Sequence, residues 1–379
     1  MSKSDLLIIG AGPAGCAAAA TALQRGLSVT IVDKFAFPRD KLCGGLVTGR
    51  SMRVLKELFS LDPISDLFVK TNHIRLCAGD RELFNKHNAP TMYMTMRRDF
   101  DQALLNHCIH NGANFIHGVA SQIRNSQLKL RDGREFGFEV LIGADGASSV
   151  VARTVLGKAT HTARMGFGLE IEAPRVDPDD NAVELDLNAV SWGYGWSFPK
   201  HQTRTVGVGG LHGKNPDIKV LMHSYTQKMA PGAVGILQKG AFLPFGHFVK
   251  HPGRGRIILA GDAAGLVDPI TGEGIALALE SGAFAGDAAA DAITQRSPEK
   301  SHQIYRRKIS KIHQDLRCAR LLRFFMFAKI AKPVTESAFA RSTITDMYLN
   351  LLNGEVSYPE VAKSAIKRLP KLILRKIFS

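Results

Sequence analysis

The first regular pattern of hydrophobic positions in the chain is a strand, a helix and a second strand. Residues 6–9 form a run of four apolar side chains, which is the pattern of a parallel strand buried on both faces. An alanine-rich helix is expected from residue 13, and a second apolar run fills residues 29–32. Similar runs at residues 140–143 and 256–260 predict two further buried strands much later in the chain.

Shorter, alternating stretches between these runs predict a second sheet. Residues 73–77, 82–84 and 92–94 are strand-like and look like part of a separate sheet, and residues 165–210 alternate as antiparallel strands do. Past Ser297 the chain reads as helical and basic to its end. The other expected elements are helices at 48–59, 97–108, 217–229 and 276–293, a strand at 114–119, and a hairpin turning at Asp132 and Gly133.

The composition is that of a folded protein with two packed domains. The chain has 379 residues, of which 45% are hydrophobic and 22% charged, so it is too long for one small core and too apolar for a disordered chain. It contains no run of eighteen uncharged apolar residues, so no membrane-spanning helix is expected. The first apolar run enters a glycine turn almost at once, which argues against a secretory signal.

Five cysteines are scattered through the sequence, at positions 16, 43, 77, 108 and 318. They form no CxxC pair and no metal-ligand spacing, so no metal site is expected. An odd, scattered set is typical of free thiols in a reducing compartment. We therefore expect a cytoplasmic protein.

The formal net charge is +15, and much of the excess lies after residue 300. No nucleic-acid-binding motif accompanies it, so nucleic acid is not expected as a partner. Between Ala362 and Phe378, apolar and basic side chains interleave at helical spacing, with Pro370 interrupting a single rod. This tail either docks peripherally on the anionic cytoplasmic face of a membrane or packs on the protein's own core. An earlier apolar cluster at residues 321–327 is too short to span a bilayer.

The turn between the first strand and the helix predicts a dinucleotide-binding unit. Gly10 permits the tight turn, Gly12 lets the backbone approach a pyrophosphate, and Gly15 lets helix and strand pack closely. The helix N-terminus offers free N–H groups and a positive dipole end to the anion. Asp33 ends the second strand, where a carboxylate can accept hydrogen bonds from a ribose.

Two later turns have the same character. Asp145-Gly146 and Gly261-Asp262 each place an acid at the end of a buried strand, followed by small residues. Small residues let the backbone approach a ligand, and the acid can orient a ribitol or ribose hydroxyl. The three segments are spread over more than 250 residues of the chain.

With these segments in this order, residues 1–295 resemble the glutathione-reductase-type FAD proteins, in the branch of aromatic hydroxylases, flavin halogenases and geranylgeranyl reductases. PRDKLCGG, residues 38–45, is similar to the Cys-Gly-Gly loop of the geranylgeranyl reductase family. YGWSFPK, residues 194–200, is similar to that family's Tyr-x-Trp-x-Phe-Pro segment, which lines the substrate cavity. Flavin halogenases carry Trp-x-Trp-x-Ile-Pro instead, and Tyr194 and Phe198 depart from it.

The resemblance implies FAD as cofactor and two sets of site residues. The catalytic set is Cys43, Gly44, Gly45, Tyr194 and Trp196. The set that binds FAD is Gly10, Gly12, Pro13, Ala14, Gly15, Asp33, Lys34, Cys43, Gly44, Arg97, Val119, Asp145, Gly146, Gly261, Asp262, Pro269, Gly272 and Gly274. For Cys43, a proton-delivering or redox role and a small buried hydrophobe are equal alternatives.

The expected fold class is α/β, with a Rossmann-like FAD-binding domain, an inserted antiparallel-sheet substrate domain and a helical C-terminal region. The FAD-binding domain is expected at residues 1–60, 97–155 and 251–297, and the sheet domain at residues 61–96 and 156–250. Residues 298–379 are expected to form the basic helical region.

The implied reaction is saturation of carbon–carbon double bonds in a polyprenyl, geranylgeranyl-type chain on a lipid, quinone or pigment precursor. The electron donor is expected to be NADPH or a reduced electron-transfer protein, and no second GxGxxG for a nicotinamide is present. Two alternatives remain: a flavin-dependent monooxygenase or halogenase on the same scaffold, and a flavin electron carrier that acts on no small molecule.

Overall fold

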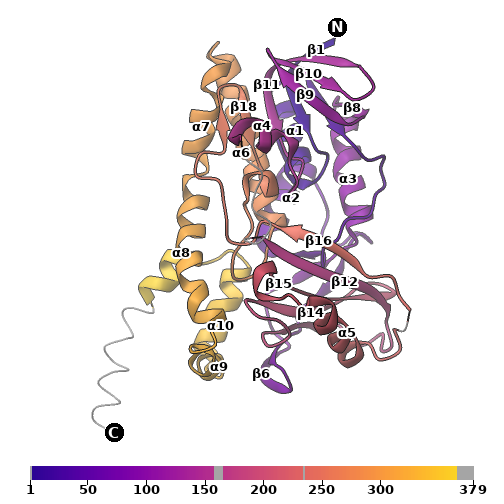
Figure 1. Cartoon of the computed structure of the whole chain (residues 1–379), viewed down its shortest axis with the longest axis vertical. Helices are drawn as coiled ribbons and strands as arrows, with labels where there is room; N and C mark the ends of the chain where they lie inside the picture. The colour runs from indigo at the N-terminus through magenta and orange to yellow at the C-terminus, as the bar shows by residue number, and fades with distance from the viewer. Residues whose placement is uncertain (1, 158–164, 234, 365–379) are drawn as a thin grey trace.

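The computed structural model describes residues 2–157, 165–233 and 235–364. Its main features are two large β-sheets and a column of C-terminal helices (Figure 1). The first sheet occupies the upper part of Figure 1 and the second the lower part. The C-terminal helices run alongside both sheets.

The first sheet has eight strands, with β1 (Ser2–Ile9) in its interior and the order β17-β18-β11-β1-β2-β8. β1 pairs in parallel with β11 (Glu135–Gly143) and β2 (Val29–Asp33). β11 and β2 pair in parallel with β18 (Ile257–Leu259) and β8 (Asn114–His117), respectively. The antiparallel additions are β9 (Ala120–Arg124), β10 (Gln127–Leu130) and β17 (Gly253–Arg254). Because parallel strands end at the same edge, the turns after β1, β11 and β18 meet there.

Helices with small residues pack closely against this sheet. α1 (Pro13–Gln24) and α6 (Ile275–Thr294) touch backbone to backbone, because a Cβ added at Gly282 would lie 2.1 Å from the Ala14 oxygen. α2 (Gly49–Phe59) contacts α6, and α3 (Arg97–His110) contacts α1. α4 (Val150–Leu156) follows β11.

The second sheet has seven strands in the order β16-β12-β15-β14-β13-β5-β6. It is antiparallel except for the parallel pair of β13 with β5, and α5 (Ile218–Met229) contacts β15. The strands are β5 (Ile74–Ala78), β6 (Arg81–Lys86), β12 (Gly166–Pro174), β13 (Val183–Asp186), β14 (Gly193–Pro199), β15 (Thr203–Leu211) and β16 (Lys239–Leu243). Residues 92–94, grouped with these strands in the sequence pattern, instead form β7 (Met92–Met94) in a small sheet with β3 (Leu46–Val47) and β4 (Val69–Thr71).

The C-terminal helices are α7 (Ser301–Lys308), α8 (Ser310–Phe327), α9 (Lys332–Phe339) and α10 (Ser342–Leu352). Phe339 and Leu349 share a hydrophobic cluster with Trp196 and Phe198 of β14, so α9 and α10 cover part of the second sheet. Among the described helices, none is both long and apolar enough to cross a membrane. The tail for which an amphipathic helix is predicted lies almost entirely at residues 365–379, outside the described residues.

Candidate functional site

Of the three motif glycines in the turn after β1, only Gly12 has free space beside its backbone. A Cβ at Gly10, whose φ is +107°, would lie 2.3 Å from the Ala144 oxygen, and one at Gly15 would lie 1.8 Å from the Gly10 oxygen. A Cβ at Gly12 would approach only Nη2 of Arg39, at 3.6 Å. The first turn of α1 has no side-chain cap, so its N–H groups can bind an anion at this opening.

Asp33 holds the same turn from the end of β2. Its Oδ2 accepts a hydrogen bond from Ala11 N at 2.7 Å, and its Oδ1 accepts one from Phe35 N at 2.9 Å. The buried carboxylate therefore lies beside the glycine turn, and its ribose contact stays a prediction. Lys34 follows it with Nζ 4.9 Å from the Phe35 ring centroid, and Val119 lies between β8 and β9.

The structure brings the three predicted nucleotide segments together. Ala144 N donates to the Ile9 oxygen at 2.8 Å, which joins the end of β11 to the end of β1. Ala260 N donates to the Gly143 oxygen at 3.0 Å, which joins the end of β18 to the end of β11. A Cβ at Gly261 would lie 2.9 Å from Cβ of Ala14, so the third segment reaches the start of α1.

The two later acids face different neighbours. Asp145 accepts from Ser149 Oγ at 2.5 Å and from Val150 N at 2.6 Å, so its carboxylate caps α4, and burial raises its pKa. Gly146 beside it has open space around its Cβ position. Asp262 lies 3.9 Å from Lys41 Nζ, and its Oδ1 would be 3.7 Å from a Cβ at Gly274.

The segment from Pro269 to Gly274 leads into α6, whose N-terminus has no side-chain cap. A Cβ at Gly272 would lie 2.5 Å from the Tyr194 hydroxyl, so the segment contacts β14. Tyr194 donates to the Thr271 oxygen, and burial raises the Tyr194 pKa above its usual range. Glu273 accepts from Thr48 Oγ1 at 2.6 Å, and burial raises its pKa to about 7.

A buried ion cluster joins the start of α3 to the loop after Asp33. Asp101 is fully buried and accepts from Arg97 Nε at 2.8 Å and Arg97 Nη2 at 2.7 Å. Arg39 Nη2 lies 3.1 Å from Asp101 Oδ2. Burial alone would lower the Arg97 pKa, but the Asp101 and Cys43 side chains beside it raise the pKa above its usual value. The cluster therefore links the Gly12 opening to Cys43.

The PRDKLCGG loop packs directly on the YGWSFPK strand, although about 150 residues separate them. A Cβ at Gly44 would lie 2.7 Å from the Phe198 ring and 3.3 Å from Trp196 Nε1. Gly45 has a φ of +73°, and its Cβ would lie 2.0 Å from the Thr95 oxygen. The predicted catalytic residues thus form one contiguous group, and the glycines are what allow the two segments to touch.

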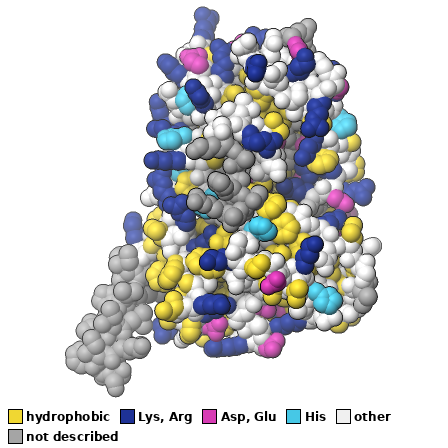
Figure 2. All heavy atoms as spheres, viewed as in Figure 1, with side chains coloured by type: hydrophobic (Ala, Val, Ile, Leu, Met, Phe, Trp, Pro, Cys, Tyr) yellow, Lys and Arg dark blue, Asp and Glu magenta, His cyan; other side chains and the backbone are white. Residues whose placement is uncertain are grey.

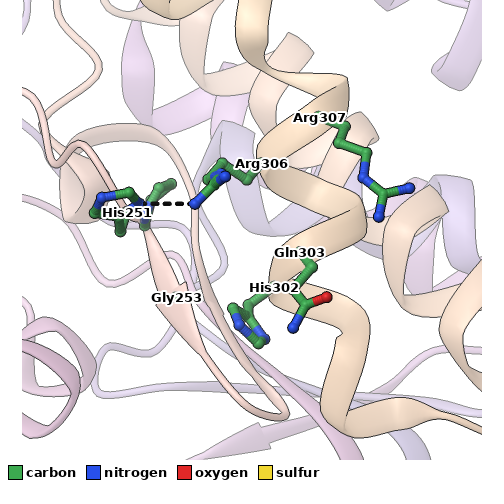
Figure 3. A pocket seen from close by; sticks show the side chains of 7 residues that line it. His251, Gly253, His302, Gln303, Arg306 and Arg307 are labelled. Carbon is green, nitrogen blue, oxygen red and sulfur yellow. Dashed lines mark hydrogen bonds between the residues drawn. The ribbon is translucent and has the colours of Figure 1, made fainter.

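Two of the hollows among the described residues have ionisable side chains in their lining. One of about 270 Å³ lies beside this group, lined by Asp66, Leu67, Val69, Met94, Thr95, Met96, Asp99, Lys200 and His201. The other, of about 350 Å³, lies between the β17 segment and α7 and is lined by His251, Pro252, Gly253, His302, Gln303, Arg306 and Arg307. In Figure 3, Arg306 points from α7 toward His251, and its Nη1 lies 3.2 Å from His251 Nδ1. None of the predicted site residues lines either hollow.

Sequence reasoning missed four site-adjacent residues: Arg39, Asp101, Glu170 and Lys200. Glu170 accepts from Cys43 N at 2.9 Å, and Lys200 donates to the Gly44 oxygen. Lys200 carries an available signal, because it directly follows the Tyr-x-Trp-x-Phe-Pro segment. Arg39 lies within the PRDKLCGG segment, whereas Asp101 and Glu170 lie in neither of the two matched segments.

The site fits an FAD molecule on its own geometry. The Gly12 opening and the uncapped starts of α1 and α6 suit a pyrophosphate. Arg39 supplies a cation, and its buried Nε has no hydrogen-bond partner among the described residues. No group of three metal-ligating side chains occurs in the described part of the chain. The Gly12 opening, the uncapped helix starts and Arg39 together suit an organic dinucleotide.

Comparisons with known proteins agree with this geometry. Residues 3–186 match the family model of an FAD binding domain. The chain is 28% identical to digeranylgeranylglycerophospholipid reductase of Methanosarcina acetivorans over 80% of each chain. It is 32% identical to menaquinone reductase of Mycolicibacterium smegmatis over 76% of each chain. The chain belongs to the geranylgeranyl reductase family of FAD-dependent oxidoreductases.

Solved structures show the same fold in this family and beside it. A geranylgeranyl bacteriochlorophyll reductase-like protein of Thermoplasma acidophilum superposes with a TM-score of 0.73 at 21% identity, over 94% of this chain and 93% of the other. The flavin-dependent brominase Bmp2 gives a TM-score of 0.76 at 18% identity, over 98% and 100%. The predicted fold class and the FAD cofactor are confirmed, and the family is an enzyme family.

Proposed function

We propose that this geranylgeranyl reductase family member saturates carbon–carbon double bonds of a polyprenyl chain carried on a lipid, quinone or pigment headgroup. The observation that carries the proposal is the direct packing of the Cys43–Gly45 loop on Trp196 and Phe198. The relatives named as menaquinone reductase and digeranylgeranylglycerophospholipid reductase support it, and the second name contains the geranylgeranyl chain.

In this proposal, FAD supplies the hydride when it is bound and reduced. The chain's own residues bind the cofactor at Gly12 and Arg39 and keep water away from the alkene. Trp196 and Phe198 are buried and give that region an apolar wall. Apolar surface contributes about 25 cal/mol per Å² buried, so a long prenyl chain can supply the energy that holds an unreactive double bond in place. The Tyr194 hydroxyl donates a hydrogen bond to the backbone oxygen of Thr271. In this proposal the thiol of Cys43 is the proton donor to the second carbon.

The reaction is tested by anaerobic incubation of dithionite-reduced protein with geranylgeranyl-bearing lipids and quinones. We expect products heavier by one H₂ for each reduced double bond, formed without O₂. Cys43→Ala should keep FAD bound and lower the product yield, because the thiol is not required to fill the flavin site. Loss of FAD and of folding in Cys43→Ala would make Cys43 structural.

Two other outcomes would identify another function on this fold. The brominase neighbour is the observation that favours an oxygen-dependent reaction. Product that forms only with O₂ and carries oxygen or halogen would assign a monooxygenase or halogenase. Reduced flavin that passes electrons to an acceptor while every alkene stays unchanged would assign an electron carrier. Supplying NADPH in one arm and a reduced ferredoxin-type protein in another identifies the donor.

A membrane-facing surface accompanies this proposal. Five large apolar side chains within fourteen residues are between 49% and 83% exposed, and we name them the apolar ridge: Leu321, Phe324, Phe325, Ile330 and Val334. Exposed Arg317, Arg320 and Lys329 flank them. Apolar side chains gather at the lower left of Figure 2, over the region where Figure 1 places α8 to α10. On the inner side of the same helices, Met326 and Phe327 share a cluster with Tyr194.

We propose that the apolar ridge docks on an anionic bilayer. Docking would bring the side of β14 that the C-terminal helices cover near a substrate held in the membrane. Phe325→Ser with Ile330→Ser should reduce flotation with phosphatidylglycerol vesicles at least about tenfold, because each buried large apolar side chain contributes about 1.5–3 kcal/mol. The matched control is Val176→Ser with Leu237→Ser, which changes two apolar residues that are 85% and 77% exposed elsewhere.

Flotation equal in both double variants would contradict the docking surface, as would a wild-type protein that floats on neither anionic nor phosphatidylcholine vesicles. Deleting residues 365–379 separates the ridge from the basic tail. Flotation lost only in the deletion would transfer the docking role to the tail.

A further inference from the structure

Two buried ionisable side chains hold the backbone of Cys43 and Gly44. Glu170, on β12, accepts a hydrogen bond from Cys43 N at 2.9 Å. Lys200, at the residue after β14, donates one to the Gly44 oxygen. The two groups reach the loop from different strands of the seven-stranded sheet, so the loop is tied to that sheet through both ends of one short segment.

Besides these two contacts, the loop is held by the packing of Gly44 on the Phe198 ring and by the contact of the Cys43 side chain with Arg97. Gly44 and Gly45 have no side chains, and a Cβ at Gly45 would lie 2.8 Å from Lys200 Nζ. Further hydrogen bonds of these residues run from Gly45 N to Cys43 Sγ at 3.4 Å and from Thr95 N to the Gly45 oxygen at 2.9 Å. A glycine pair is conformationally free, so polar contacts to its backbone decide where it lies.

These contacts are costly for the fold. Glu170 and Lys200 are only 4% and 3% exposed. Glu170 Oε2 is buried and has no hydrogen-bond partner in the described part of the chain. Buried ionisable groups without full pairing oppose folding by several kcal/mol in order of magnitude. Packing alone therefore gives no reason for two such groups at one glycine loop.

We propose that Glu170 and Lys200 are positioning residues that clamp the backbone segment of Cys43 and Gly44 from its two ends and thereby fix the Cys43 thiol at the reaction site. The assignment to the reaction rests on the proposed reductase function. The effect on the loop itself requires no substrate and no particular reaction.

Electrostatics make the clamp dependent on pH. Burial raises the pKa of Glu170 to about 7 and lowers the pKa of Lys200 to about 8. Well below the first value Glu170 is mainly protonated, well above the second Lys200 is mainly neutral, and around these two values both groups carry a large share of their charge. Charged groups make the stronger hydrogen bonds, so the clamp should hold the loop best between these values. The other groups that influence the pair are Glu172, Lys239 and the Cys43 thiol, and His201, Asp66 and Asp99 line the hollow beside Lys200.

The test is hydrogen exchange of a peptide spanning residues 41–47 in the FAD-loaded protein, corrected for the intrinsic pH dependence of exchange. Glu170→Leu and Lys200→Met should each speed exchange at pH 7.5 by at least about tenfold, because each removes a hydrogen bond to a charged group. Glu170→Gln keeps an acceptor for Cys43 N and should stay much closer to wild type. It should also remove the slope of exchange against pH near 7.

Two controls come from the same sheet and from the helix that packs on it, Glu184 on β13 and Lys228 on α5. Glu184→Leu removes a buried carboxylate that pairs with Arg75, and Lys228→Met removes a lysine that donates to the Gly79 oxygen at 2.7 Å. Neither should change exchange at residues 41–47. Where reductase activity is measurable, Lys200→Met should lower kcat with FAD still bound, and Glu170→Gln should restore most of what Glu170→Leu loses.

Unchanged exchange at residues 41–47 in folded Lys200→Met would overturn the clamp, and so would equal effects of Glu184→Leu and Glu170→Leu. If Glu170→Leu does not fold, the pH profile of Glu170→Gln and the exchange of Lys200→Met decide the question. Protein without prenyl reductase activity but with the expected exchange pattern would contradict the proposed function and leave the clamp standing.

Discussion

A valine at position 12 should give a folded protein that carries no FAD. Gly12 has φ −83° and ψ −175°, an extended conformation that any residue adopts, and its nearest neighbour to an added Cβ is Arg39 Nη2 at 3.6 Å. The apoprotein therefore has room for the side chain. The valine side chain would occupy the opening between the start of α1 and Arg39, where the pyrophosphate is proposed to lie. The side chain and the phosphate therefore compete for the same space.

The measurement is flavin absorbance after purification and after reconstitution with excess FAD. We expect Gly12→Val to show almost none in both states. Its melting temperature should equal that of wild-type protein stripped of FAD, because a ligand that binds only the folded state adds stability only when it is bound. Gly232→Val is the control, since Gly232 has an ordinary φ and nothing within 4 Å of its Cβ position. Stoichiometric FAD in Gly12→Val would place the pyrophosphate elsewhere.

The fold could be predicted largely because its buried strands are apolar runs. Residues 6–9, 29–32 and 140–143 allow little other than parallel strands covered on both faces, and they lie in β1, β2 and β11. A three-residue stretch such as residues 92–94 does not indicate which strand it pairs with. β7 consequently pairs with β3 and β4, which the sequence pattern did not indicate.

Within the site, motifs identified the loop and the strand but not what joins them. Glu170 is 127 residues from Cys43, and an isolated acid in an alternating strand has no local signature. Asp145 shows a related ambiguity, because an acid after a buried strand suits a ribose contact and a helix cap equally well. Ser149, which donates to Asp145 and caps α4 itself, was the available sign of a helix start.

Asp101→Asn should be the most destabilising single substitution at the site. Asp101 is fully buried and is the anion between Arg97 and Arg39, at 2.7 Å from Arg97 Nη2 and 3.1 Å from Arg39 Nη2. An asparagine removes the charge and places an amide near guanidinium groups that can only donate. Breaking a buried ion pair by removing one partner costs about 3–5 kcal/mol, and we expect that loss in the free energy of unfolding by urea.

The size of this loss depends on burial, and the chain contains the comparison that shows it. Asp132 also pairs with an arginine, Arg134 at 2.6 Å, but both side chains are about half exposed. Water solvates that pair, so Asp132→Asn should change the unfolding midpoint little. Replacing Asp101 and Arg97 together by leucine and methionine should recover part of the stability, because no unpaired charge from that pair stays buried. Equal midpoints for Asp101→Asn and Asp132→Asn would show that solvent reaches the Asp101 cluster and that Arg39 is not held there by this carboxylate.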